Sequence, residues 1–265
     1  MANEQYVQKH YEKVAKNFGL LPTSSMQDPF IRELEIEFVL AQLYNFTHKY
    51  GRFPRLLDVG CGNGYLLSVL AEFFPEMELT GLEYSPDLFK LCQQRKLPGI
   101  NFIHGDMRKA SDFSEKFDMV ITERSLINLL STKQQNQAIK NIAHCLAPGG
   151  HYLMIESFKM PLHNLNIARA QNGLSEIFPS KHNKYLSEGI TGKLKGIGLN
   201  EVYGELPKDS LSTHFFLSRV FHPITRNSTT KNKYSMLNHF FDEALPLGVG
   251  QFSPILFRVF EKELS

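Results

Sequence analysis

The stretch LLDVGCGNGYL at residues 56–66 decides the fold of this 265-residue chain. Its first four residues, apolar apart from Asp58, predict a buried strand, and the apolar run after the turn predicts a helix that stops at Pro75. The turn between them holds Gly60, Gly62 and Gly64. Glycine lets the backbone approach a ligand closely and leaves N–H groups free to point at it, so the turn predicts a binding loop. A tight turn without a ligand is the alternative for such a motif taken alone.

Strand and helix patterns alternate strictly from residue 56 to residue 157. The expected strands carry the sequences RLLDV (55–59), MELTGLE (77–83), INFIHGD (100–106), FDMVIT (117–122) and HYLMIES (151–157). Alternation of this kind predicts an α/β fold whose parallel sheet is covered by helices on both faces. Right-handed crossovers bring the carboxyl ends of the strands to one edge, where ligands bind in such folds.

Acidic residues fall at or just past four of these strand ends, at Asp58, Glu83, Asp106 and Glu123. We expect them along one edge of the sheet, beside the glycine turn. Glu83 could accept hydrogen bonds from a ribose diol, or it could be a solvated acid at a helix start. Asp106 could accept from an exocyclic amine. Asp58 could fix the glycine turn or a ligand's amino group rather than take part in chemistry.

Composition excludes several classes of protein. A net charge of +2 and 21% charged residues are ordinary for a globular protein and require no polyanionic partner. The three cysteines are odd in number and widely spaced, which argues against a disulfide framework or a zinc ribbon and fits a reducing compartment. The polar N-terminus does not resemble a signal peptide, and no apolar run reaches the ~18 residues of a membrane span. The sequence therefore predicts a cytoplasmic protein with no stable membrane association.

The rest of the chain is less regular, and we expect one domain over 1–265. Residues 1–50 predict a helical cap, 51–157 the ligand-binding core, 158–185 and 209–250 insertions that form a lid over the strand ends, and 186–208 and 251–265 further sheet elements. The aromatic stretch at 209–250 includes HFFLSRVF, which could touch a membrane surface or simply pack in the lid. Its only basic segment, HPITRNSTTKNK, does not resemble a nucleic-acid site, so no nucleic-acid partner is expected.

Five segments together resemble the class I S-adenosylmethionine-dependent methyltransferases of the small-molecule type. They are LLDVGCGNGYL, LTGLEYSPDL, INFIHGDM, FDMVITERSLINLL and CLAPGGHYLMIES, and they occur in the family's order and spacing. The resemblance covers about residues 55–157 closely. It implies a doubly wound, mostly parallel seven-stranded sheet, the Rossmann-like methyltransferase fold, with S-adenosylmethionine as the cofactor. A nicotinamide site is disfavoured, because Tyr65 stands where the third glycine of GxGxxG would fall.

The resemblance also implies a set of cofactor-binding residues. Gly60, Cys61, Gly62 and Gly64 would surround the methionine part with Asp58 in support, Glu83 and Tyr84 would lie at the ribose, and Asp106 with Met107 at the adenine. Arg32 is the candidate partner of the cofactor carboxylate, and a surface ion pair with Glu33 or Glu35 is its alternative. Tyr6 and Tyr11 fall where an N-terminal helix commonly closes over the cofactor, and core packing is the alternative for both.

Candidate catalytic and acceptor-binding residues follow the fourth strand or lie in the late insertion. Glu123 could be a general base, a ligand for the cofactor or acceptor, or a structural partner of Arg124. Asn128 is expected near the acceptor. His214 is an alternative base and His222 a further candidate near the acceptor, although a given histidine is more often a packing residue.

Missing motifs restrict the reaction. TERS at 122–125 is not the [DNS]PP[YF] motif of amino-group methyltransferases, and no Pro-Cys is present there to attack cytosine. No Asp-Asn pair follows the fourth strand as in the metal-dependent catechol-type enzymes, so no metal is expected. The leading hypothesis is metal-independent methyl transfer to a hydroxyl of a sugar-like or other small molecule. Methylation of a protein, lipid or RNA, and a cofactor-binding protein without transfer activity, are the alternatives.

Overall fold

A seven-stranded sheet forms the centre of the protein in the computed structural model, which describes residues 2–112, 115–226 and 235–264. The strand order is β3-β2-β1-β4-β5-β7-β6, and all neighbours pair in parallel except β7, which runs antiparallel to both β5 and β6. The predicted α/β fold with a doubly wound, mostly parallel sheet is confirmed. The strands are β1 (Leu56–Val59), β2 (Leu79–Glu83), β3 (Ile100–His104), β4 (Phe117–Glu123), β5 (Leu146–Ser157), β6 (Leu199–Val202) and β7 (Ile255–Lys262).

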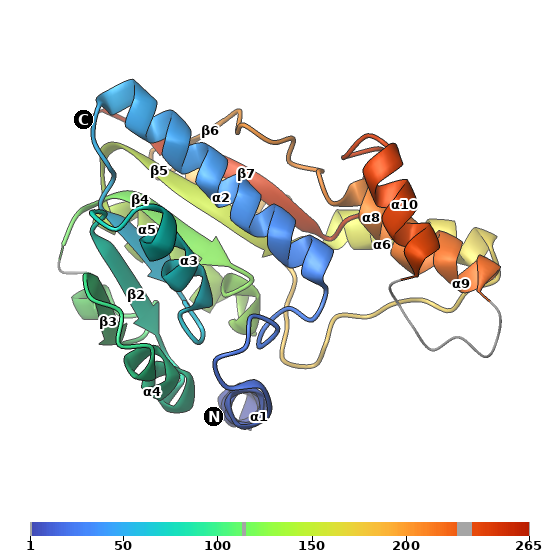
Figure 1. Ribbon diagram of the computed structural model, residues 1–265, viewed down its shortest axis with the longest axis horizontal. Helices are drawn as coiled ribbons and strands as arrows, with labels where there is room; N and C mark the ends of the chain where they lie inside the picture. The colour runs from blue at the N-terminus through green and yellow to red at the C-terminus, as the bar shows by residue number, and fades with distance from the viewer. Residues whose placement is uncertain (1, 113–114, 227–234, 265) are drawn as a thin grey trace.

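Helices surround the sheet and extend beyond one end of it (Figure 1). They are α1 (Ala2–Phe18), α2 (Pro29–Tyr50), α3 (Tyr65–Phe73), α4 (Pro86–Gln94), α5 (Thr132–Cys145), α6 (Lys159–Gln171), α7 (Ile190–Lys195), α8 (Ser212–Phe216), α9 (His222–Thr225) and α10 (Met236–Ala244), with short turns η1 (Ala110–Asp112), η2 (Leu126–Asn128) and η3 (Leu217–Phe221). The longest, α2, starts at Pro29 behind the cap Asp28 and ends at Tyr50, before Gly51 in the left-handed conformation.

Alternation along the strands divides the core into two layers. Leu56 of β1 faces the layer formed with α2 and α3, whereas Leu57 faces the layer formed with α5 and α7. The same alternation separates Ile121 from Val120 on β4. Side chains of successive strand residues point to opposite faces, so continuous apolar runs produce a sheet that is buried on both sides.

Two parts of the chain lie outside this sandwich, as Figure 1 shows. Helix α1 lies beyond the strand ends, near α4. The second part, which we call the lobe, consists of α6, α8, η3, α9 and α10 and projects from the end of the sheet where β5 and β7 meet it. Residues 227–234 of the expected 209–250 insertion lie outside the described residues. None of the helices described is both long and apolar enough to cross a membrane.

Candidate active site

One cavity of about 900 Å³ opens at the carboxyl ends of β1, β2 and β4. This volume lies near the upper end of the roughly 300–1,000 Å³ usual for ligand pockets, so there is room for more than one small molecule. Its lining comes from the glycine turn, the strand ends, α1, the segment 24–32, the loop 180–185 and helices α8 and η3 of the lobe. The predicted edge of the sheet is therefore a real concave site.

The glycine turn wraps around the carboxylate at the end of the next strand. Glu83 accepts hydrogen bonds from the backbone N–H of Gly62 at 2.8 Å and of Ser85 at 2.6 Å. Burial raises the pKa of Glu83 to about 7, although the backbone donors oppose the shift. Gly60 has φ +83°, and a Cβ there would lie 2.5 Å from the Cβ of Ser125. The turn thus needs glycine at this point both for its backbone conformation and for close packing.

Gly64 differs from the other two glycines of the turn. It caps α3 with φ +73°, and a Cβ there would come within 3.1 Å of the Phe102 ring. It is absent from the cavity lining. The expectation that Gly64 contacts the cofactor is therefore not met, because this glycine serves the packing of α3 against β3.

Asp106 lines the cavity but already has a partner. Arg108 holds both carboxylate oxygens, with its Nη2 2.7 Å from Oδ2 and its Nε 2.9 Å from Oδ1. Burial acts to raise the pKa of Asp106, and Arg108 outweighs it, so the pKa is lowered. Arg108 also pairs with Glu4 of α1. The ion pair therefore ties the N-terminal helix to the strand edge, next to Met107, which also lines the cavity.

Four buried charged groups form a network beneath the cavity. Arg32 pairs with Glu123 and donates to Ser25 Oγ at 2.8 Å, and Arg124 donates to Glu123 Oε1 at 2.9 Å and pairs with Glu35. Burial, and then the nearby Arg32 charge, lower the pKa of Arg124 to about 9. Arg124 also has a positive φ of 51°, which is strained for a residue with a side chain. Glu123 is the partner of two arginines, so the sequence-based choice of Glu123 as a base loses its physical basis.

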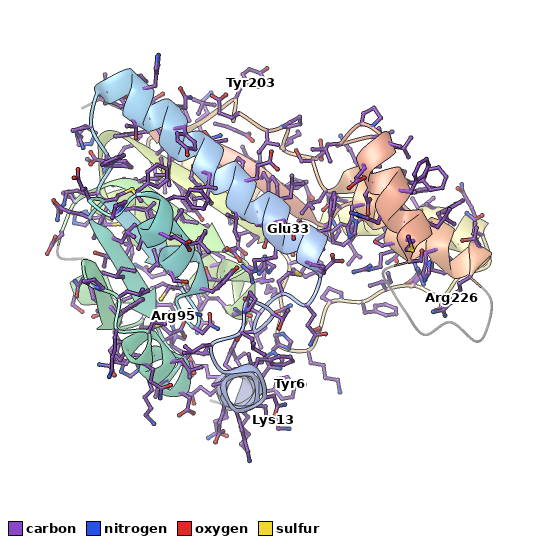
Figure 2. All side chains as sticks on the ribbon, in the orientation of Figure 1. Tyr6, Lys13, Glu33, Arg95, Tyr203 and Arg226 are labelled. Carbon is purple, nitrogen blue, oxygen red and sulfur yellow. The ribbon has the colours of Figure 1, made fainter. Side chains whose placement is uncertain are left out.

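The alternative given for Arg32, a surface ion pair with Glu33 or Glu35, holds for Glu35 as a partner but not for a position at the surface. The Arg32 side chain is 9% exposed, and the neighbouring Glu33 lies on the outer side of α2, as Figure 2 shows. Glu35 is fully buried and 3.8 Å away. Helix α2 thus turns Arg32 toward the cavity and Glu33 toward solvent, as their positions one residue apart dictate.

Two polar atoms beside the glycine turn have no partner among the residues described. They are Oδ1 of Asp58 and Nε of Arg32, and both residues line the cavity. Burial, followed by the nearby charges of Glu123 and Glu83, raises the pKa of Asp58 well above its usual value. A buried acceptor and a buried donor without protein partners are costly unless a ligand satisfies them.

The two tyrosines of α1 have different positions. Tyr11 lines the cavity, and burial followed by the Glu83 charge raises the pKa of its hydroxyl. Asn128, which also lines the cavity, faces that hydroxyl. Tyr6 is 47% exposed and is not among the residues that line the cavity. The expectation that Tyr6 closes over the cofactor is wrong, because it lies on another face of the helix.

The histidines proposed from the late insertion do not reach the cavity. His214 is 2% exposed, and its ring nitrogens lie 3.0 Å from Asp28 Oδ2 and 2.8 Å from Asp242 Oδ2. Burial acts to lower its pKa, and the two carboxylates outweigh burial and raise it. His222 is 5% exposed, with Ser235 Oγ 3.4 Å from its Nδ1. Both predictions are corrected: these side chains hold the lobe together and do not line the site.

Other polar residues of the two insertions divide in the same way. Asn166 and Arg169 donate to backbone carbonyls of the loop after α6, whereas Arg219 lines the cavity with its guanidinium over the Phe215 ring. The sequence analysis missed Arg108, Arg124, His10 and His182. Only Arg108 had a local signal, since it lies two residues after a strand-end acid. The described residues contain no cluster of three or more metal-ligating side chains.

Comparison with known proteins agrees with this geometry. Residues 56–150 match a family model described as a methyltransferase domain. The chain is 30% identical over 135 residues to the phthiotriol/phenolphthiotriol dimycocerosates methyltransferase of Mycobacterium leprae. The aligned segment is 49% of this chain and 46% of the relative. These matches support the resemblance of residues 56–150 to the class I S-adenosylmethionine-dependent methyltransferases. The chain spans about half the length of the curated relatives it matches.

Two further methyltransferases show the range of likeness. The fatty-acid O-methyltransferase of Mycolicibacterium smegmatis is 28% identical over 152 residues, which is 56% of this chain and 54% of the relative. The plantazolicin methyltransferase BamL, solved with a triazolic desmethylPZN analogue and SAH, has a TM-score of 0.59 at 17% identity and covers 98% of this chain and 96% of its own. The BamL likeness extends over the sheet, α1 and the lobe, and it shows the fold alone.

Proposed function

We propose that this protein transfers the methyl group of S-adenosylmethionine, without a metal, to a hydroxyl of a small molecule. The observation that carries the proposal is the pair of unpartnered polar atoms on Asp58 and Arg32 beside the glycine turn. A buried carboxylate oxygen and a buried guanidinium N–H are complementary to the ammonium and carboxylate of an amino acid. S-adenosylmethionine carries such a group at one end and an adenosine at the other.

The remaining lining residues suit the adenosine. Glu83 has lone pairs beyond those used by the two backbone donors and would accept from the ribose hydroxyls. Asp106, fixed by Arg108, would accept from the adenine amine beside Met107. Gly62, Cys61 and Tyr84 line the same region. These placements are the ones that the resemblance to the methyltransferase family implies, and the chemistry of the groups is compatible with them.

The chain's own contribution to the reaction is alignment and exclusion of water. When bound, the cofactor supplies an electrophilic methyl group. Holding an acceptor in line with that methyl can supply roughly 7–11 kcal/mol of the barrier. A dry site enclosed by α1 and the lobe would favour a transfer in which positive charge on the cofactor is lost. In this proposal Glu123 keeps Arg32 and Arg124 in position and does not itself take the acceptor proton.

The acceptor end of the cavity mixes apolar and hydrogen-bonding groups, among them Ser157, Asn183, Tyr185, Phe215 and Arg219. This mixture fits a sugar-like or other polyfunctional small molecule. A lipid acceptor is the second candidate, because the Mycolicibacterium smegmatis relative is named a fatty-acid O-methyltransferase and Ile127, Leu129 and Leu130 supply apolar lining.

Calorimetry with S-adenosylhomocysteine tests cofactor binding, and labelled S-adenosylmethionine incubated with an extract of the source organism tests transfer. Label in a small-molecule fraction supports the proposal, label in the lipid fraction favours the second candidate, and label in protein or RNA overturns both. Binding without any label supports a non-catalytic cofactor-binding protein. Glu123→Gln should weaken cofactor binding by loosening Arg32. Loss of transfer with unchanged affinity would instead make Glu123 a catalytic group.

A further inference from the structure

Two histidines line the cavity and stack on each other. His10 belongs to α1 and His182 to the loop after α6, and their ring centroids lie 3.6 Å apart with the planes inclined by 16°. The Tyr11 ring meets His10 edge-on at 5.1 Å and His182 at 6.3 Å. Neither histidine has a hydrogen bond to any residue that the structure describes. Their ring nitrogens are therefore available to a molecule in the cavity.

Most of the acids that line the cavity are engaged in ion pairs. Glu4 and Asp106 pair with Arg108, Glu123 pairs with Arg32 and Arg124, and Asp28 pairs with His214 and Arg219. A carboxylate neutralised by an arginine is a weak proton acceptor. Glu83 and Asp58 are not paired with an arginine in this way, but the proposed function assigns them to the ribose and the ammonium of the cofactor. Among the described lining residues that the cofactor does not use, the histidine pair is the candidate base.

His182 is the better fixed of the two rings. Its loop is held to the body of the protein by Lys184 N–H, which donates to the Ile127 carbonyl at 2.7 Å, and by Gln135 Nε2, which donates to the Lys184 carbonyl at 2.8 Å. This anchors His182 directly beside η2, the turn that follows β4. His10 lies on the covering helix and stacks on one face of the His182 ring.

We propose that His182 accepts the proton of the methyl acceptor, with His10 as the residue that positions its ring, so that the acceptor is a hydroxyl or an amine rather than a carboxylate. This inference rests on the proposed methyl transfer. The acceptor oxygen or nitrogen forms a bond to the methyl carbon, the carbon–sulfur bond breaks with its electron pair going to sulfur, and S-adenosylhomocysteine is released. The acceptor's proton moves to a ring nitrogen of His182 and from there to water.

The electrostatics keep both rings neutral. Burial, and then the neighbouring His10, lower the pKa of His182 to about 4, and burial followed by the Lys13 charge lowers the pKa of His10. At physiological pH a ring nitrogen of His182 can therefore accept a hydrogen bond from the methyl acceptor, and the low pKa means that a proton taken up during transfer passes on to water. A carboxylate acceptor would carry no proton to remove, so a neutral histidine pair would have no task there.

Sinefungin provides a test that needs no knowledge of the acceptor. In this analogue of S-adenosylmethionine a carbon that bears an amine replaces the sulfonium and its methyl, so a base near the reacting centre can accept from the amine. We expect His182→Phe, which keeps the stacked ring but removes its nitrogens, to weaken sinefungin binding about ten-fold, because hydrogen bonds to charged groups are strong. Its affinity for S-adenosylhomocysteine should change less than about two-fold.

His10→Phe is the matched control, because it keeps the stack and leaves the nitrogens of His182 in place. We expect it to change both affinities less than about three-fold. Equal losses for both ligands in His182→Phe, or none, would overturn the proposal, and a sinefungin-specific loss in His10→Phe would give the role to His10. If the wild-type protein binds neither nucleoside, the proposed function fails instead.

A second measurement keeps the inference testable if His182→Phe does not fold. In wild-type protein with ¹⁵N-labelled histidine, the ring-nitrogen resonances of His182 should shift with sinefungin and much less with S-adenosylhomocysteine. Identical shifts for the two ligands would contradict the assignment.

Discussion

The cavity and the lobe each enclose a histidine, and the two side chains are used in opposite ways. In the lobe both ring nitrogens of His214 meet carboxylates, of Asp28 and Asp242, and its pKa is raised. At the cavity His182 touches other rings, makes no hydrogen bond to described residues, and has a pKa of about 4. Burial alone therefore does not identify a functional group. What distinguishes a site is a buried polar atom that faces open space with its bonding capacity unused.

The largest effect should follow from breaking the lobe cluster. His214→Ala leaves two buried carboxylates without their central partner, and we expect the free energy of unfolding to fall by about 3–5 kcal/mol, measured by urea denaturation. The control is the triple variant Asp28→Asn, His214→Phe, Asp242→Asn, which removes the charges together and should recover most of the loss. A single variant as stable as the wild type would show that the cluster is not a structural element.

The carboxylates at the strand edge should make stability depend on pH. Burial raises the pKa of Glu83 and of Glu156 from 4.5 to about 7. The folded state favours the protonated form of each carboxyl group. The contribution of each group to the free energy of unfolding is therefore fully present below pH 4.5, and about 3 kcal/mol of it is lost as the pH rises through 7. We expect Glu83→Gln and Glu156→Gln each to remove part of this slope in unfolding titrations between pH 4 and 9.

Cofactor affinity separates these two acids. Glu83 lines the cavity, whereas Glu156 lies behind it and accepts the backbone N–H groups of Ser125 and Leu126 at 3.0 and 2.9 Å. Only Glu83→Gln should weaken S-adenosylhomocysteine binding. Equal losses in both variants would mean that Glu83 acts through the fold and does not contact the ribose.

Asp58 offers a sharper test of whether a buried polar atom without a partner marks a ligand-binding group. Asp58→Asn removes a buried charge whose Oδ1 lacks a partner in the described chain. We expect cofactor affinity to fall by about 1.5–3 kcal/mol, since a charged hydrogen bond is lost, while stability at pH 8 stays the same or rises. Calorimetry and urea denaturation measure the two quantities. A drop in stability with unchanged affinity would place Asp58 among the structural groups.

The smallest effect should appear at His182. Its pKa is depressed in the folded state, so its contribution to stability is present above pH 6.5 and is lost as pH falls toward 4. Because the ring is partly open to solvent, we expect a loss of about 1–2 kcal/mol over this interval. His182→Phe should flatten the acid limb of the stability profile, and His214→Phe should not reproduce that flattening.

Much of the fold was readable from local patterns. The glycine turn, the Pro86 that opens α4 behind the cap Ser85, and the apolar runs of β1 and β4 are short-range features. Their alternation also placed Asp58, Glu83, Asp106 and Glu123 at one edge, because parallel strands connected by right-handed crossovers share that edge. The antiparallel β7 and the division of the late insertion between cavity and lobe had no comparable local signal.

The sequence by itself therefore determined the sheet, the binding turn and which acids lie at its edge, since the periodicity of each element and the handedness of each crossover are local properties of the chain. Only the tertiary structure decided which of those acids stay free. Arg32 meets Glu123 from 91 residues away, and His214 meets Asp28 from 186 residues away. The partner of a buried charge is chosen by how distant elements pack, and that choice separates a group that binds a ligand from one that holds the fold together.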